Sequence, residues 1–485
     1  MKLCIAKTVA VASLLTGTAQ ADLPVAYDIV ELGALERVPQ QDGSRARQSS
    51  FGYALNNNGD RVGHSFGEHL VINEREVNGI IIREEATLDL LQPLDFTDLS
   101  RTITPEDREL GFGTGELGIY ATSVNENSII SGYGFDNEFY PVLNENEDGI
   151  CEETNEVRQE LRRAYYFDLN NNLVQVPTNY TVGTPLGSET EYFGTAFLDS
   201  NNDYFVGYGG VVTEKGDCDN LETITNRGMI FDVNTSSPVF IGVLEESENE
   251  ANAQSVIRGI NQANQFVGWS HKVEDEERIA RAIIGSVGSS EITEVTGLSG
   301  GTNSFLWKIN NSGSYAVGSS TKESNLNLLT AFYYDPILQV SEEIGYLNEQ
   351  FPYSEAYSVN NDNIVVGVSQ ISRSPINYSA FAYDIDGTEG MVDLNDLIDC
   401  DAGWTLSEAR EINDNGWIIG TGTTLVEQED GQFSGEVRGF LLIPRATEAD
   451  RSCETQVVSN SGGFFNPLAL LFLSVFGLIL RRRKA

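Results

Sequence analysis

The chain has 485 residues, of which 40% are hydrophobic, and its 72 acidic and 30 basic side chains give a formal charge of −42. A charge this negative argues against nucleic-acid binding, which needs a basic surface. The hydrophobic content and regular β pattern argue against a disordered chain, so we expect a folded protein with a solvated acidic face.

Residues 1–21 read as a secretory signal peptide. Lys2 and Lys7 give a positive start, residues 8–15 are apolar, and small residues lead up to Ala21. The apolar stretch is too short to span a bilayer. We therefore expect signal peptidase to cut after Ala21, with export across the inner membrane.

Seven segments between residues 54 and 420 share a core of Ile/Val/Leu-Asn, a turn, two apolar residues and Gly. The cores end at Gly63, Gly132, Gly207, Gly268, Gly318, Gly367 and Gly420. Asn-Gly turns supply the positive φ that tight hairpins need, and Gly late in the second strand indicates close backbone approach. The repeated Asn is therefore interpreted as a turn residue. The third copy lacks both the Asn at this register and the turn Gly.

Two further strands recur between the cores. One has the form of residues 331–335 (Ala-Phe-Tyr-Tyr-Asp), whose aromatic side chains we expect in the core, and the other that of residues 344–347 (Ile-Gly-Tyr-Leu). No long helical period appears. The sequence predicts an all-β fold, a β-propeller of about seven four-stranded blades spanning residues 22–450. The alternative is another repeat-built architecture such as a β-solenoid, which the unequal repeat spacing of 49 to 75 residues disfavours.

The last unit lacks a fourth strand, whereas residues 27–35 form a spare strand at the start. We expect this strand to pair with the strand around Phe440 and close the ring. The other phasing, in which it begins the first blade, is also open.

Four cysteines beyond Cys4 indicate two disulfides in an exported chain. Cys151 and Cys218 lie in the same kind of connection in successive blades, which favours an inter-blade bond. Cys400 and Cys453 then pair by elimination and fasten the segment after the last strand.

No catalytic residue is assigned, because HExxH does not occur and 72 acids produce carboxylate pairs by chance. His64 and His271 are expected on the surface at strand ends. Weak calcium ligands are Asp148, Asp384 and Asp386, which lie near a permissive Gly; no other cofactor is expected.

Long connections on a rigid scaffold usually carry binding functions. Four of them, at residues 92–117, 136–161, 180–192 and 213–225, are expected to share one face of the ring. The four tryptophans, Trp307 among them, are expected to pack beside strand cores.

The C-terminal end is an apolar run with a basic terminus. Ser461-Gly462-Gly463 closes a linker of residues 451–463. The tail of residues 464–485 begins with a largely apolar run of seventeen residues, 464–480, which Arg481-Arg482-Arg483-Lys484 follows at once. Seventeen residues reach roughly 26 Å as a helix, enough to span a membrane, so a plain anchor is one interpretation. This order resembles the GlyGly-CTERM sorting tail, which implies cleavage near Gly462 and Gly463 by a rhomboid-type protease and release to the surface or medium.

The repeat motifs themselves also resemble a known family. The Ile-Asn-x-x-Gly-x-Ile/Val-Val-Gly core, Ala-Phe-x-Tyr-Asp and Asp-Leu-Asn-Asp-Leu (residues 393–397) resemble the HAF-type extracellular repeat, over about residues 27–444. Together with the tail, the chain resembles uncharacterised exported proteins of gammaproteobacteria. This resemblance implies no activity or catalytic residues.

We therefore expect a non-catalytic cell-surface or secreted binding protein whose ligand is a polysaccharide or a protein. One alternative is a secreted polysaccharide-active lyase or hydrolase with its site at the propeller axis. The other is a structural component of the envelope or matrix.

Overall fold

The computed structural model describes residues 23–34, 49–68, 75–82, 88–90, 117–134, 139–146, 149–159, 162–167, 173–176, 179, 191–215, 218, 221–244, 253–274, 277–289, 291–427 and 433–453. The predicted signal peptide with Ala21, the calcium candidate Asp148, the Gly462-Gly463 pair and the tail of residues 464–485 lie outside these residues. Within the described part of the chain, no helix is long and apolar enough to cross a membrane.

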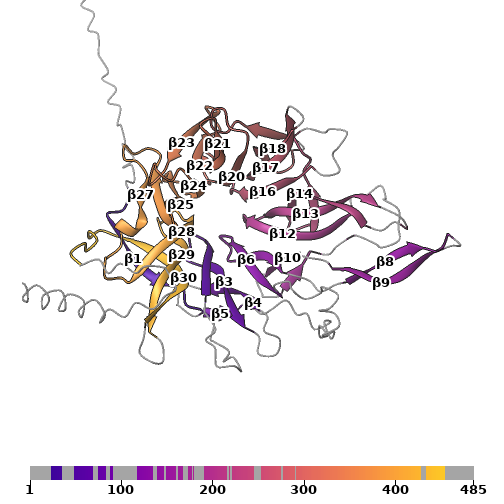
Figure 1. Ribbon diagram of the computed structural model, residues 1–485, viewed down its shortest axis with the longest axis horizontal. Coiled ribbons are helices and arrows are strands. Elements are labelled where there is room, and N and C mark those ends of the chain that lie inside the picture. Colours follow the sequence, from indigo (N-terminus) through magenta and orange to yellow (C-terminus); the bar gives the residue numbers. More distant parts are fainter. Residues whose placement is uncertain are drawn as a thin grey trace, which may run out of the picture.

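The described residues form an all-β propeller, in which sheets are arranged radially around a central axis (Figure 1). Four consecutive four-stranded sheets follow one another along the chain. They are β12 (Tyr192–Ser200), β13 (Tyr204–Lys215), β14 (Leu221–Asp232) and β15 (Ser237–Phe240); β16 (Ser255–Ile260), β17 (Gln265–Glu274), β18 (Glu277–Ser286) and β19 (Ile292–Val295); β20 (Ser304–Ile309), β21 (Ala316–Lys322), β22 (Asn325–Asp335) and β23 (Val340–Gly345); and β24 (Ser354–Val359), β25 (Ile364–Arg373), β26 (Ile376–Asp384) and β27 (Val392–Asp393). The four-stranded repeat unit predicted from the sequence is confirmed in these sheets.

The two repeats before them share one eight-stranded sheet. It contains β2 (Ser49–Leu55), β3 (Arg61–Glu68), β4 (Arg75–Ile82) and β5 (Leu88–Leu90), then β6 (Leu117–Val124), β7 (Ile130–Gly134), β10 (Arg163–Phe167) and β11 (Leu173–Gln175). A short parallel pairing of β4 with β6, Glu76 opposite Leu117, joins the two units. For this reason the seven repeats form six hydrogen-bonded sheets around the axis, and the hairpin of β8 (Phe139–Glu145) and β9 (Cys151–Gln159) forms a separate two-stranded sheet.

The last sheet combines strands from both ends of the described chain. Its order is β1 (Ala26–Glu31), β30 (Phe433–Arg445), β29 (Ile418–Glu427) and β28 (Trp404–Ile412). Ile29 lies opposite Leu442 in an antiparallel ladder, so the expected pairing of the N-terminal strand with the Phe440 strand is present.

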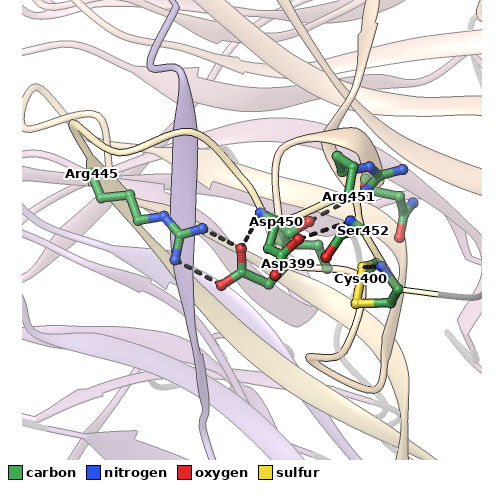
Figure 2. Close-up of a disulfide and its surroundings, with 9 residues drawn as sticks. Asp399, Cys400, Arg445, Asp450, Arg451 and Ser452 are labelled. Atoms are coloured by element: carbon green, nitrogen blue, oxygen red, sulfur yellow. Dashed lines mark hydrogen bonds and ion pairs between the residues drawn. A yellow bond between two sulfur atoms is a disulfide. The ribbon is translucent and has the colours of Figure 1, made fainter.

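Charged groups and a disulfide hold this junction together (Figure 2). The Arg445 guanidinium makes two hydrogen bonds to the Asp399 carboxylate and a third, of 2.9 Å, to Asp28 on β1. Arg445 lowers the pKa of Asp399 to about 2. The Cys400–Cys453 disulfide fixes the chain that follows β30, and the Cys400 N–H donates to the Asp450 carbonyl at 3.0 Å. The pairing expected by elimination is therefore confirmed.

Each repeat bends its first strand at the same place. The register of the first hairpin shifts by one residue in all seven repeats, for example between Leu306 and Lys308, which leaves Trp307 as the extra residue of a β-bulge. The repeated Gly of the second strand faces this bulge: a Cβ on Gly318 would lie 1.9 Å from the Phe305 carbonyl oxygen. The close backbone approach inferred from the repeated Gly is confirmed, since only glycine leaves room for it.

The core lies between successive sheets. One cluster joins Ala380 and Ala382 of β26 to Leu406 and Ala409 of β28, and the other clusters likewise draw on neighbouring sheets. Phe332 on β22 is fully buried, as are Phe231, Phe381 and Phe440 on the corresponding third strands. This confirms the core position expected for the third-strand aromatics. The packing between neighbouring sheets holds their first strands in place around the axis.

Candidate axial binding site

Seven asparagines form a closed circle of hydrogen bonds at one end of the axis. Each side-chain Nδ2 donates to the backbone carbonyl of the next asparagine, over 2.8 to 3.3 Å. The members of this asparagine ring are Asn56, Asn125, Asn201, Asn261, Asn310, Asn360 and Asn413, and Asn413 donates back to Asn56.

The asparagine ring is the repeated turn residue of the sequence. Each Oδ1 accepts N–H groups of its own turn, as Asn360 does from Asp362 at 3.1 Å and Ile364 at 2.9 Å. The turn interpretation is confirmed. In the third repeat Asn201 takes the same place six residues before Gly207, because a shorter turn brings it there.

The bulge residues form a second ring next to the asparagine ring. Each lies three positions before its asparagine, and together they line one axial cavity. This bulge ring consists of Tyr53, Thr122, Leu198, Arg258, Trp307, Tyr357 and Arg410. The bulges therefore place seven side chains on the axis, one from each repeat.

Between the two rings, three charged residues form an ion triad across the axis. Lys308 Nζ lies 2.9 Å from Asp199 Oδ1 and 2.6 Å from Glu411 Oε1. The remaining carboxylate oxygens accept backbone N–H groups of the following repeat, Ile260 at 2.9 Å and Leu55 at 3.0 Å. Although burial opposes the charge on Lys308, the two carboxylates raise its pKa well above the usual value. Burial raises the pKa of Glu411, and Lys308 counteracts this.

The ion triad separates two cavities. A cavity of about 70 Å³ is lined by five members of the asparagine ring and by the triad. A cavity of about 90 Å³, the bulge-side cavity, is lined by the bulge ring and the triad. A volume of this size holds several water molecules or one small polar group of a ligand.

Two arginines and three aromatic rings give the bulge-side cavity its chemistry. The Arg258 guanidinium lies 4.5 Å from the ring centroid of Trp307. Arg410 lies 4.6 Å from the ring of Tyr357 and 5.4 Å from that of Tyr53. These are cation–π distances, so the aromatic rings hold both guanidiniums at the axis.

The two arginines differ in how their charge is balanced. Arg410 forms an ion pair with Glu408. Among the described residues no carboxylate pairs with Arg258, and its buried Nε has no hydrogen-bond partner. Burial lowers the pKa of Arg258 and the charge of Arg410 lowers it further, against the effect of neighbouring tyrosines.

The expectation of a surface position for His64 is wrong. His64 is 8% exposed, its ring stacks on Phe51 at 4.8 Å, and it contacts Tyr120 at 5.0 Å. Burial lowers its pKa to about 4, with a further contribution from Arg410. His64 therefore belongs to the aromatic surroundings of the bulge ring and is neutral near pH 7.

His271 is half-buried at the end of the first hairpin of its sheet, and its Nδ1 accepts the Gln254 N–H at 3.0 Å. The expected surface position therefore holds only in part for this residue.

The calcium candidates Asp384 and Asp386 lie in one turn. Asp384 Oδ1 accepts the Asp386 N–H at 2.9 Å, and Asp386 Oδ2 accepts Asn363 Nδ2 at 2.7 Å. Over the described ranges, no three His, Cys, Asp or Glu side chains gather in the manner of a metal site. These oxygens form the hydrogen bonds of the turn.

Two of the expected long loops are largely strands. Residues 139–145 and 151–159 form the β8–β9 hairpin, which extends outward from the ring (Figure 1), and β13 and β14 extend over most of residues 204–232. The expected disulfide between Cys151 and Cys218 is confirmed, and it ties the hairpin to the next sheet. Two disulfides are typical of proteins that fold in an oxidising compartment.

Sequence reasoning did not single out Arg258, Trp307, Tyr357 or Arg410, and it assigned Trp307 to packing. A signal was present, however. Aligned on the repeated asparagine, the position three residues earlier carries Tyr, Thr, Leu, Arg, Trp, Tyr and Arg, whereas the flanking positions are mostly small or aliphatic.

The chain is similar to one protein family over part of its length. Residues 243–454 match the model of the family described as "Protein of unknown function (DUF3466)". This match spans the sheets from β16 to β30 and ends just after Cys453. No curated protein matches the chain significantly.

Similar solved structures include the propeller domain of a protease and a peptidase. The β-propeller domain of the Trilobed protease from Pyrococcus furiosus is 9% identical with a TM-score of 0.41, over 81% of this chain and 94% of that one. An acylaminoacyl peptidase from Pyrococcus horikoshii is 8% identical with a TM-score of 0.40, over 80% of this chain and 52% of that one. The chain thus spans about half the length of the second protein.

Proposed function

We propose that this chain is a non-catalytic binding protein whose ligand enters the bulge-side cavity at the propeller axis. The bulge ring is the observation that carries this proposal. Seven equivalent backbone positions present five different residue types to one cavity, with two guanidiniums held by aromatic rings. Different side chains on a repeated scaffold are typical of a recognition site.

Binding without turnover is favoured by the state of the ion triad. Lys308 is engaged by two carboxylates, and each carboxylate also accepts a backbone N–H. A general base or nucleophile needs a free, poised group within reach of the substrate. The triad side chains are instead committed to joining three repeats across the axis.

We further propose a ring of seven blades, with the eight-stranded sheet counted as two, since the asparagine ring has one member from each repeat. The same proposal places the mature protein at the cell surface or outside the cell, after signal-peptide removal at Ala21 and cleavage near Gly462 and Gly463. The resemblance of the repeats to the HAF type and of the C-terminal end to a GlyGly-CTERM sorting tail supports this location.

A binding and turnover screen on the purified full chain tests the function. We expect saturable binding of a polysaccharide or protein ligand without product release. Leu198→Trp, which fills the bulge-side cavity, should abolish binding, whereas Leu425→Trp, at a partly exposed position on β29, should not. Product release, or binding that Leu198→Trp leaves intact, would contradict the proposal, provided that thermal unfolding shows both variants folded.

A further inference from the structure

The bulge-side cavity holds a cation, Arg258, that no carboxylate of the described residues balances. Arg258 faces the Trp307 ring at 4.5 Å, and its buried Nε lacks a hydrogen-bond partner. Burying a charged group without a counter-charge is unfavourable, and an anion beside it removes much of that cost. This imbalance lies inside a chain whose formal charge is −42, so a general excess of basic residues does not explain it.

The second arginine lies at the same level of the axis. Arg410 comes from β28 and Arg258 from β16, and both line the same cavity of about 90 Å³. The positive charge of Arg410 reduces the proton affinity of Arg258, so the two guanidiniums act on one another. Two planar guanidiniums offer N–H pairs whose spacing matches the two oxygens of a carboxylate.

The remaining lining limits the kind of anion. Trp307, Tyr357 and Tyr53 add aromatic surface beside the guanidiniums, which favours an organic group over a strongly hydrated inorganic ion. The ion triad blocks the side toward the asparagine ring and carries two carboxylates against one ammonium. An anion is therefore expected to lie on the arginine side of the cavity, away from Asp199 and Glu411.

We propose that the bulge-side cavity binds the carboxylate group of an organic acid, held between Arg258 and Arg410 and flanked by Trp307 and Tyr357. This inference rests on the proposed function and names the chemical group that the site recognises. The volume accommodates the carboxylate group, and the rest of a larger ligand lies outside the cavity.

Calorimetric titration of the full chain at low ionic strength tests this assignment. The probes are D-glucuronate, N-acetylglycine and benzoate, with D-glucose and benzamide as uncharged counterparts and sulfate and phosphate as inorganic anions. We expect the carboxylates to bind and their uncharged counterparts not to bind. The first two probes distinguish a sugar carboxylate from a peptide-like one.

Matched variants locate the site. Arg258→Met should weaken carboxylate binding at least about tenfold, and Arg258→Lys, which keeps the charge but not the planar fork, should weaken it less. Arg373→Met, at the exposed last residue of β25, should leave the affinity unchanged. Thermal unfolding of each variant separates loss of binding from loss of folding.

Three outcomes would overturn the assignment. Equal binding of D-glucose or benzamide, unaffected by Arg258→Met, would mean that the ligand is not anionic, while the proposed binding function survives. Sulfate or phosphate binding as tightly as the carboxylates would contradict the organic class. Ligands that bind equally well to the Leu198→Trp variant would place recognition outside the cavity and refute the proposed function itself.

Discussion

The asparagine ring and the bulge ring occupy neighbouring levels of the same axis, yet they differ in composition. The first has the same residue in all seven repeats, and the second has five residue types at seven equivalent positions. In every repeat the asparagine has the same two roles: it accepts the hydrogen bonds of its own turn, and it donates one to the next repeat. The bulge side chains share no such structural role, and for this reason we propose that they recognise the ligand.

The largest effect on stability is expected in the ion triad, which lies between the two rings. Lys308→Met leaves Asp199 and Glu411 buried without their counter-charge and should lower the free energy of unfolding by about 3–5 kcal/mol. Denaturant unfolding at pH 7 measures it. Adding Glu411→Gln to the variant should recover part of the loss, and a loss below about 1 kcal/mol would show that the triad does not join the repeats.

The pH dependence of stability distinguishes the asparagine ring from the surroundings of the bulge ring. Asparagine does not titrate, whereas His64 does. The ring centroid of His64 lies 6.1 Å from that of Tyr53 in the bulge ring. The pKa of His64 is lowered from 6.5 to about 4, so between these values the unfolded chain binds a proton that the folded protein does not. Stability from this residue is complete above pH 6.5 and is lost as the pH falls toward 4, by up to about 3 kcal/mol.

Unfolding curves of the wild type and His64→Phe at several pH values between 4 and 7 measure this contribution. The variant should lose less stability over that window than the wild type. Parallel losses would mean that His64 is not held in its neutral form.

The asparagine ring is expected to show a purely structural effect. Asn360→Ala removes the Nδ2 bond to Asn413 and two bonds to its own turn, at a site that is 3% exposed, and should cost about 2 kcal/mol. Asn361→Ala, next to it but exposed, should cost less than half as much. If the two variants lose equal stability, the ring contributes nothing beyond an ordinary surface turn.

The smallest effect on stability is expected in the bulge ring. Arg258→Met keeps an aliphatic chain against Trp307 and removes a buried charge, so the free energy of unfolding should change by less than about 1 kcal/mol. A variant of the bulge ring would then lose ligand binding but little stability, whereas a variant of the asparagine ring would lose stability. A loss of several kcal/mol would instead assign Arg258 to the scaffold.

Much of this architecture follows from local sequence rules. The repeated Asn and Gly predict the hairpins, Tyr27–Leu35 reads as the missing strand of the last unit, and Cys400 and Cys453 pair as expected. Each of these predictions depends on turn residues, on the two-residue period of strands, or on the number of strands and cysteines, all of which can be read from a single sequence.

The candidate site was less accessible to such rules. A β-bulge moves one residue out of the two-residue period, so Trp307 and Arg258 appear as ordinary strand positions until the pairing register is known. The glycine opposite each bulge, such as Gly318 facing Phe305, marks the position, but the sequence alone does not say which strand it approaches. The ion triad joins residues of the third, fifth and seventh repeats, and local patterns contain no such long-range relation.

The pairing of β1 with β30 also determines the order in which the protein can fold. Asp28 and Arg445 are 417 positions apart, so β1 has no partner until the residues between them have been synthesised. Contacts of such high sequence separation form late and slow the final step of folding. Until β1 pairs with it, β30 presents an unpaired edge to other chains, so conditions that delay this pairing should favour aggregation over completion of the last sheet.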